Sequence, residues 1–296
     1  MKTLIVITGP TGSGKTSLAI EVARALGAHI ISADSRQIYR GIPIGTAAPT
    51  PEELDAAPHH FVSILDLDEY YSAARFEEEA LALAEELWRD GDYVVMAGGS
   101  MMYVDAVCDG IDLIPTVSEE NRRRAYGLYE TGGIEAVREE LLRLDPDYYA
   151  RVDLANAKRL VHAVEVSYEA GRPYSSLLSG QKKVRPFRVL KFAIDWPREQ
   201  LFDRINRRVD AMIAAGLEDE ALRVYHMRHL NSLNTVGYKE MFAMFDGTMS
   251  RDVALPRIAK NTRVYAKKQL TWLRRDPSVH WLDPAAPLLP ALLSTL

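Results

Sequence analysis

Within its first 27 residues the chain carries a short apolar run, a glycine-rich loop and a segment of helical periodicity. The loop, GPTGSGKT at residues 9–16, fits the pattern G-x-x-x-x-G-K-[ST]. Residues 4–8 have the character of a strand, and residues 17–26 that of a helix stopping at Gly27. A phosphate-binding loop between a strand and a helix predicts an α/β fold, with a P-loop NTPase-like core built on a mostly parallel sheet.

Each part of this loop suits a phosphorylated ligand. Gly9, Gly12 and Gly14 let the backbone turn its N–H groups toward a phosphate, and the following helix adds the positive end of its dipole. Lys15 supplies a positive charge for the terminal phosphates, and Thr16 can place its hydroxyl on a Mg²⁺ ion. The loop alone does not reveal which phosphorylated compound binds.

A second polar feature, Asp34, follows the next apolar run at residues 28–32. In an open parallel sheet, ligands bind outside the carboxyl ends of the strands, where both the glycine-rich loop and Asp34 are expected. A carboxylate at this point could bind Mg²⁺, act as a general base or cap a turn. A kinase would use such a residue to hold its acceptor, and an alkyl transferase would use it to take a proton from a nucleophile.

Composition excludes several classes of protein. The 296 residues are 47% hydrophobic and 26% charged, with one cysteine, Cys108, so neither an internal disulfide nor a thiolate zinc cluster can form. The net charge of -5 means that any nucleic-acid site must be a local patch. No apolar run approaches the length of a membrane span. The loop at residue 9 leaves no room for a signal peptide, so a cytoplasmic protein is expected.

The middle of the chain differs from its flanks in composition and in hydrophobic pattern. Residues 113–185 are dense in charge and helical periodicity, which predicts about four short helices inserted between core strands. The segment 189–196 returns to a strand pattern. We therefore expect a P-loop core made of residues 1–112 and 186–296, with a helical insertion domain at 113–185. Earlier in the chain, Ser72 is expected to cap a helix.

Two later segments are predicted to be amphipathic helices. In residues 198–216, Arg208 lies beside the apolar arc, where an arginine can snorkel from the core or face a ligand. Residues 255–275 contain no Asp or Glu, so their cations cannot form ion pairs within the helix. A bound polyanion would relieve the repulsion between these cations. The expected apolar face of this helix is Ile258, Ala259, Tyr265, Ala266, Leu270, Trp272 and Leu273. The expected basic face is Arg257, Lys260, Arg263, Lys267, Lys268 and Arg274.

Seven sequence blocks, in this order, resemble the bacterial tRNA dimethylallyltransferase (tRNA isopentenyltransferase) family over residues 3 to about 283. The later blocks are absent from generic P-loop kinases, which makes the resemblance specific. The blocks are GPTGSGKT, SADSRQIYRGIPIGTAAP at 32–49, PHHF at 58–61, YSAARF at 71–76, AGGSMMYVDAV at 97–107, NTVGYKEM at 234–241 and NTRVYAKKQLTWLR at 261–274.

The resemblance implies a reaction. The dimethylallyl group of dimethylallyl diphosphate moves to N6 of the adenosine just 3′ of a tRNA anticodon, and pyrophosphate leaves. The glycine-rich loop would then bind a diphosphate leaving group in the presence of Mg²⁺, and Asp34 would take the proton from an adenine that has been flipped out of the anticodon loop. The tRNA partner would be bound through its anticodon stem-loop by a cytoplasmic enzyme that is expected to be a monomer.

The resemblance also assigns roles to individual positions. The catalytic residues would be Asp34, Thr16 and Arg208, with Thr16 on Mg²⁺. The diphosphate would be bound by Gly9, Pro10, Thr11, Gly12, Ser13, Gly14, Lys15 and Thr16. The tRNA would be bound by Asp34, Ser35, Arg36, Gln37, Ser100, Arg122, Lys158, Arg159, His162, Lys260, Arg263 and Lys267.

Two positions depart from the family pattern. Ser100 stands where threonine is usual, which keeps the hydroxyl, and Lys268 stands where arginine is common, which keeps the charge but loses the planar guanidinium. Three other functions stay open at this point. They are a related transferase acting on free adenine nucleotides, a small-molecule kinase using ATP, and a nucleotide-gated RNA-binding module without chemistry.

Overall fold

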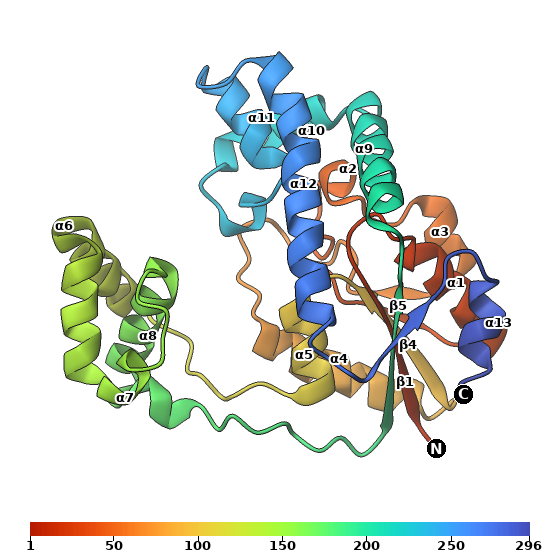
Figure 1. Ribbon diagram of the computed structural model, residues 1–296, viewed down its shortest axis with the longest axis horizontal. Coiled ribbons are helices and arrows are strands. Elements are labelled where there is room, and N and C mark those ends of the chain that lie inside the picture. Colours follow the sequence, from red (N-terminus) through yellow and green to blue (C-terminus); the bar gives the residue numbers. More distant parts are fainter. The chain divides into compact units, whose positions relative to one another are not determined.

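The computed structural model describes all 296 residues, which form two compact units. Unit 1 comprises residues 1–109 and 184–296, and unit 2 comprises residues 110–183. The segment expected to be a helical insertion, 113–185, therefore supplies most of unit 2 (Figure 1). The chain leaves unit 1 once and returns to it once.

Unit 1 is built on a six-stranded parallel sheet of order β3-β2-β4-β1-β5-β6, which confirms the predicted α/β fold. The strand that precedes the glycine-rich loop, β1, lies inside the sheet between β4 and β5. The strands are β1 (Thr3–Thr8), β2 (Ile30–Ser32), β3 (His59–His60), β4 (Tyr93–Gly98), β5 (Arg188–Ile194) and β6 (Val279–Leu282).

Helices cover both faces of this sheet, and the central side chains of β1 are apolar on both faces. Leu4 and Val6 pack into an apolar cluster with helices α4 (Ala73–Leu87) and α5 (Met101–Asp109). Ile5 and Ile7 point the other way, toward α1 (Lys15–Leu26) and α13 (Leu288–Leu293) (Figure 1). A strand with two covered faces must be apolar on both, as the run LIVI is.

Helices α9 to α12 lie beyond the carboxyl end of β5, where α9 and α12 are side by side, whereas α3 packs beside α1 (Figure 1). They pack through Leu201, Ile205 and Ala266. The cap predicted at Ser72 is confirmed, since its side chain accepts the N–H of Arg75 at the start of α4. The other elements of unit 1 are α2 (Pro43–Thr46), α3 (Pro51–Ala56), α9 (Arg198–Ala214), α10 (Leu217–Val224), η2 (Tyr225–Met227), η3 (Asn231–Leu233), α11 (Tyr238–Phe245) and α12 (Arg251–Leu273).

Unit 2 is helical and has its own apolar core, which includes Leu141, Leu160 and Val164. Its longest helix, α6 (Glu119–Leu144), is broken at Gly133, where φ is 66° and ψ is -163°. The two halves of α6, with α7 (Pro146–Tyr149) and α8 (Ala157–Ala170), agree with the four short helices expected; a 3₁₀ turn, η1 (Tyr174–Leu177), follows them.

None of the helices in the structure has both the length and the apolar character needed to cross a bilayer.

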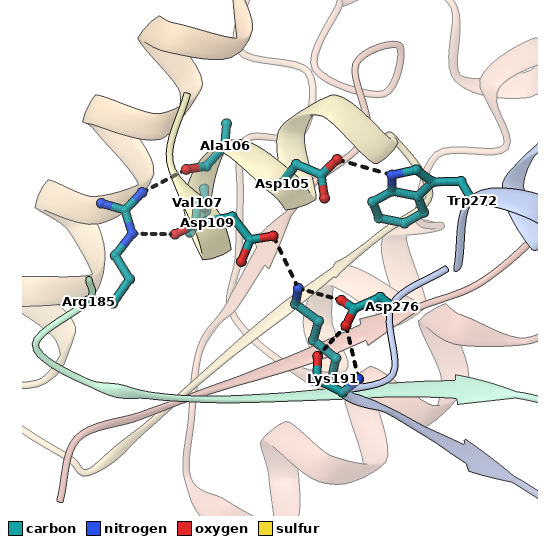
Figure 2. A network of polar contacts seen from close by, with 9 residues as sticks. Asp105, Ala106, Val107, Asp109, Arg185, Lys191, Trp272 and Asp276 are labelled. Atoms are coloured by element: carbon teal, nitrogen blue, oxygen red, sulfur yellow. Dashed lines mark hydrogen bonds and ion pairs between the residues drawn. The ribbon is translucent and has the colours of Figure 1, made fainter. Parts of the chain in front are cut away.

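A buried polar network joins α5, β5 and the carboxyl end of α12 in unit 1 (Figure 2). Lys191 is only 5% exposed, and its ammonium group lies 2.7 Å from a carboxylate oxygen of Asp276 and 3.7 Å from one of Asp109. Trp272, in the last turn of α12, donates its indole N–H to Asp105 on α5. Because a buried charge is costly unless it is paired, this network fixes the end of α12 against the sheet.

Asp276 is expected to make stability depend on pH in the acid range. Burial opposes its charge, but hydrogen bonds from Lys191 and Ser278 outweigh burial and lower the pKa of Asp276 to about 2. A lowered carboxyl pKa stabilises the folded state above its unfolded value near 4, and that contribution is lost as the pH falls toward 2.

We expect Asp276→Asn to lower the free energy of unfolding at pH 7 by about 1–2 kcal/mol, and to flatten its pH dependence between pH 4 and 2. Urea titrations at several pH values measure both quantities. Asp92→Asn, at an exposed ion pair with Lys2, is the control and should change little. An Asp276→Asn variant as stable as the wild type at pH 7 would contradict this account.

Candidate active site

One pocket of about 520 Å³ lies in unit 1 at the carboxyl ends of the strands, where ligands bind in sheets of this kind. Its wall is formed by the glycine-rich loop, by the segments that follow β2 and β4, and by α9, α11 and α12. The predicted site residues that line it are Thr11, Lys15, Thr16, Asp34, Ser35, Arg36, Gln37, Ser100 and Arg208.

The glycine-rich loop has the curled backbone that a phosphate cradle needs. Gly12 and Gly14 have φ values of 80° and 92°, in the left-handed region that favours glycine. A side chain at residue 12 would also begin 3.0 Å from Ile205. The first turn of α1 contains no acidic residue and has no side-chain cap. No side chain therefore offsets the positive charge of its free N–H groups, which remain available to an anion.

Two side chains hold the loop from outside by binding its carbonyl groups. Arg204, on α9, donates to the carbonyl oxygen of Gly12 at 2.8 Å, and the indole of Trp196 donates to that of Ser13, also at 2.8 Å. The Arg204 guanidinium lies over the Trp196 ring, 4.4 Å from its centroid. With two carbonyl groups drawn outward, the loop keeps its N–H groups available on the inner side.

The inner side of the loop holds a positive charge and an unpartnered hydroxyl. Burial lowers the pKa of Lys15 to about 7, the charge of Arg208 acts in the same direction, and Asp34 opposes both. The Lys15 ammonium bonds only the carbonyl of Pro10. The Ser13 hydroxyl is buried without a hydrogen-bond partner. An anion in the loop would restore the lysine charge and give the hydroxyl an acceptor.

Arg208 adds a second cation on the pocket side of α9. It forms no ion pair or hydrogen bond within the protein, whereas Arg207, on the exposed side of the same helix, pairs with Asp203. Burial lowers the pKa of Arg208, and the carboxylates of Asp34 and Glu53 oppose that effect. Lys15 and Arg208, neither of which has an ion-pair partner, together indicate a ligand with more than one negative charge.

Asp34 both caps a turn and faces the pocket. Its Oδ1 accepts the N–H groups of Arg36 at 2.9 Å and Gln37 at 3.3 Å. Its Oδ2 has no hydrogen bond within the protein, and the residue lines the pocket. The turn therefore fixes one oxygen and leaves the other for a ligand, so the capping role and a chemical role can coexist.

The three residues after Asp34 make hydrogen bonds inside unit 1. Ser35 donates its N–H to the hydroxyl of Ser100, and that hydroxyl donates to the Ser35 hydroxyl. Arg36 donates to the carbonyl groups of Asn231 and Ser232, and Gln37 donates to those of Thr46 and Ala47. These contacts set the shape of the pocket mouth while the residues still line it.

Helix α12 presents a different face to the pocket from the one expected. Tyr265, predicted on the apolar packing face, is 38% exposed and lines the pocket beside Asp34 and Arg36, so that assignment was wrong. Helical period separates one side of a helix from the other, but it does not distinguish a core from a pocket wall. The helix also begins at Arg251, four residues earlier than expected, with Asp252 in its first turn.

The predicted tRNA-binding cations of α12 lie away from the pocket lining. Lys260 and Lys267 are exposed, and Arg263 is partly buried because its guanidinium donates to Asn206 on α9. The family departure Lys268, by contrast, lines the pocket.

The other predicted tRNA-binding residues belong to unit 2. Arg122 is in α6, and Lys158, Arg159 and His162 are in α8. Lys158 and Arg159 are exposed, and the His162 imidazole lies 2.9 Å from a carboxylate oxygen of Glu165. Lys158 and Arg159 lie four and three residues before His162 in α8, so both cations can lie near the imidazole on the helix surface.

Three residues that shape the loop were not predicted from the sequence: Arg204, Trp196 and Gln269. Gln269, on α12, accepts the N–H of Thr11 and donates to the carbonyl of Gly99. For Arg204 the only available signal was its position one turn before Arg208 on the same helix. For Trp196 and Gln269 no signal was available, since both bind backbone atoms of segments distant in the sequence.

Comparison with known proteins gives consistent results. A family model described as "IPP transferase" matches residues 37–276. A protein of Parabacteroides distasonis named "tRNA dimethylallyltransferase 2" is 51% identical over 284 residues, covering 96% of this chain and 95% of the relative. A protein of Bacteroides thetaiotaomicron named "tRNA dimethylallyltransferase 1" is also 51% identical, covering 96% and 92%.

Two solved structures are similar over nearly the whole chain. The full-length tRNA isopentenylpyrophosphate transferase of Bacillus halodurans superposes with a TM-score of 0.73 at 34% identity, covering 100% of this chain and 94% of the other. A eukaryotic dimethylallyltransferase described as acting on tRNA superposes with a TM-score of 0.79 at 26% identity, covering 96% and 74%.

Proposed function

This chain belongs to the IPP transferase family, and we infer from that membership that it is an enzyme that transfers a dimethylallyl group to tRNA. We propose that the donor is dimethylallyl diphosphate and that the acceptor is N6 of the adenosine 3′-adjacent to the anticodon. The bond between the allylic carbon and the diphosphate oxygen breaks, the bond from N6 to that carbon forms, and pyrophosphate leaves.

The glycine-rich loop is proposed to bind the diphosphate. Lys15 and Arg208 would offset the negative charge that grows on the leaving group, and they are half-buried, where such an interaction is stronger than in water. The buried hydroxyl of Ser13 would find its missing acceptor in a phosphate oxygen. The loop carbonyls held by Arg204 and Trp196 keep the cradle open for this anion.

Thr16 is the residue proposed to hold Mg²⁺. Thr16 lines the pocket, and its hydroxyl makes no hydrogen bond within the protein. No three His, Cys, Asp or Glu side chains come together as a metal site, which suits an ion that takes most of its ligands from phosphate oxygens and water. When bound, Mg²⁺ would neutralise part of the diphosphate charge.

Asp34 is proposed to be the general base. The exocyclic amine of adenine is a weak nucleophile because its lone pair is delocalised into the ring. A carboxylate oxygen within hydrogen-bond reach takes the proton as the new bond forms, and Oδ2 of Asp34 has no other partner. The same pocket holds the cations for the leaving group, so base and leaving-group site share one cavity.

The tRNA is proposed to be bound by residues around the pocket mouth, by the cations of α12 and by those of unit 2. Ser35, Arg36, Gln37 and Ser100 would meet the anticodon loop, while Lys260, Arg263 and Lys267 would meet its phosphates. As an enzyme of tRNA, the protein is proposed to act in the cytoplasm, as a monomer.

The observation that carries this proposal is one pocket in which Lys15 and Arg208, without ion-pair partners, share the lining with Asp34, whose Oδ2 has no hydrogen bond within the protein. The test is an assay that combines the protein with dimethylallyl diphosphate, Mg²⁺ and unmodified tRNA, with mass spectrometry of the digested product. A parallel reaction with AMP as the acceptor tests whether the enzyme acts on free nucleotides. A second, with ATP as the donor, tests whether it is a kinase. Transfer to AMP alone, or phosphate transfer from ATP, would refute the proposal.

The cations of α12 are expected to set tRNA affinity without selecting sequence. Replacing Lys260, Arg263 and Lys267 with Gln should weaken all substrate tRNAs by a similar factor, since phosphates are common to all. The slope of log affinity against log salt should fall by ~0.7–0.9 per lost phosphate contact. The two exposed lysines should contribute more than Arg263, which is bonded to Asn206.

Filter-binding titrations at several salt concentrations measure this effect. Arg24→Gln with Arg89→Gln is a matched control, because both arginines are exposed and neither lines the pocket; Arg24 is in the last turn of α1 and Arg89 follows α4. Turnover at saturating tRNA should stay close to the wild-type value in both variants. An unchanged slope together with unchanged affinity would remove α12 from the tRNA interface.

A further inference from the structure

Gln269 is a buried polar residue in α12, whose cations are mostly exposed. It is 3% exposed, and its side-chain amide is satisfied on both sides. Its Oε1 accepts the N–H of Thr11 at 2.9 Å, and its Nε2 donates to the carbonyl of Gly99 at 2.8 Å. One side chain therefore joins the glycine-rich loop to the segment that follows β4.

The fit around this amide is close. The segments that it joins leave neighbouring strands, since Thr8 of β1 is paired with Gly98 of β4. A Cβ atom on Gly99 would lie 2.5 Å from the Gln269 Nε2 and 3.3 Å from the carbonyl oxygen of Gly9. The amide thus occupies the space that any side chain at residue 99 would need, and it sets the distance between the two segments.

The chain of contacts continues to the proposed base. Ser100 follows Gly99, and its hydroxyl accepts the N–H of Ser35 at 2.8 Å and donates to the Ser35 hydroxyl at 3.1 Å. Asp34 is the residue before Ser35. Hydrogen bonds thus run from the loop that would hold the leaving group, through Gln269 and Gly99–Ser100, to the residue that would take the proton.

The helix that carries Gln269 is fixed independently of the pocket. One turn further along α12, Trp272 donates to Asp105 on α5, and beyond the helix Asp276 pairs with Lys191 on β5 (Figure 2). Lys191 also pairs with Asp109 at the end of α5. Gln269 therefore reaches both pocket segments from a rigid base, which is what accurate positioning requires.

We propose that Gln269 is a positioning residue that holds the diphosphate loop and the segment of Asp34 in register for reaction. The proposal rests on the function proposed above, in which the loop binds the leaving group and Asp34 the nucleophile. Reacting groups must meet within a fraction of an ångström, and a misplacement near 1 Å can cost about 10²-fold in rate. The Gln269 amide accepts from Thr11 and donates to Gly99 at once, whereas an ionised carboxylate cannot donate and a thioether is only a weak acceptor.

The first test uses Gln269→Met, which keeps the volume and removes both hydrogen bonds. We expect the kcat to fall about 10- to 100-fold while the KM for tRNA changes less than about threefold. Thr271→Val is the matched control on the same helix, because that hydroxyl bonds only the carbonyl of Lys267 in its own helix and is exposed. The wild-type assay comes first; failure of the wild type to modify tRNA would refute the proposed function, separately from this inference.

A readout without catalysis is the amide proton of Thr11. Freed from Gln269, it should exchange with solvent faster in Gln269→Met, while the midpoint of thermal unfolding stays near the wild-type value. A kcat within threefold of wild type in a folded Gln269→Met variant would overturn the proposal. So would a loss of activity matched by a proportionate loss of global stability, since that result indicates a purely structural role.

The second test uses Gln269→Glu, which is isosteric and keeps the inference falsifiable even where the Met variant does not fold. An ionised carboxylate accepts from Thr11 but repels the Gly99 carbonyl, and burial raises the pKa of such a group. The activity of this variant relative to wild type should therefore rise as the pH falls and the carboxyl group regains a donor. A relative activity independent of pH would contradict the proposal that Gln269 must both accept from Thr11 and donate to Gly99.

Discussion

Replacement of Asp34 by asparagine is expected to lower turnover ~10²- to 10⁴-fold, the range that a positioned general base contributes. The amide has the shape of the carboxylate, and its oxygen can still accept the N–H groups of Arg36 and Gln37, so the turn should persist. What is lost is the free Oδ2 that would take the proton from N6. Affinity for tRNA should stay close to that of the wild type, because the cations that meet its phosphates are unchanged.

Single-turnover rates with saturating tRNA and dimethylallyl diphosphate measure this effect without product release. Asp34→Ala is the informative comparison, since it removes the turn cap together with the base and should add a loss of stability of about 1 kcal/mol. Comparing the two variants separates chemistry from folding. Wild-type turnover in Asp34→Asn would show that the carboxylate only caps the turn.

The parts of the site that could be predicted are those encoded in one short segment. The spacing of GPTGSGKT between a strand and a helix predicted both the loop and its place at the end of β1. Asp34 could be assigned to the same edge because it follows a second strand, and parallel strands end on the same side. Ser72 could be identified as a cap from its own position before a helix.

The parts that could not be predicted depend on contacts between distant segments. Gln269 and Thr11 are 258 residues apart, and no local pattern distinguishes this glutamine from one in solvent. Tyr265 has the spacing of a core residue, yet its ring lies at the pocket. Arg204 is of a residue type that often binds phosphate, but here it donates a hydrogen bond to the carbonyl of Gly12 in the loop. In each case the partner, rather than the residue type, decides the role.

The unpaired cations of the pocket also carry a cost in the free protein. Lys15 and Arg208 repel one another, and burial disfavours the charge of each. A lysine whose pKa is lowered in the folded state destabilises that state at every pH below its unfolded value near 10, and the full penalty applies below about 7. We therefore infer that Lys15 and Arg208 are present to bind the ligand and not to stabilise the fold.

Lys15 should consequently couple diphosphate binding to proton uptake. The free protein holds this lysine only partly protonated near pH 7, and a bound diphosphate favours the ammonium form. At pH 8 we expect calorimetry in two buffers of different ionisation enthalpy to report net uptake of protons on binding dimethylallyl diphosphate. Between pH 7 and 9 the affinity should fall by up to about tenfold per unit.

Lys15→Met should weaken dimethylallyl diphosphate binding about 10²-fold, abolish the proton uptake, and raise the free energy of unfolding of the free protein at pH 7. Lys15→Arg is the matched control: arginine keeps its proton throughout this range, so its affinity should lose the pH dependence whatever its absolute value. Binding of tRNA alone should be unaffected by either change. Equal diphosphate affinity in the wild type and Lys15→Met would mean that the loop serves another ligand. Proton uptake that survives in Lys15→Arg would assign the titration to a different group in the pocket.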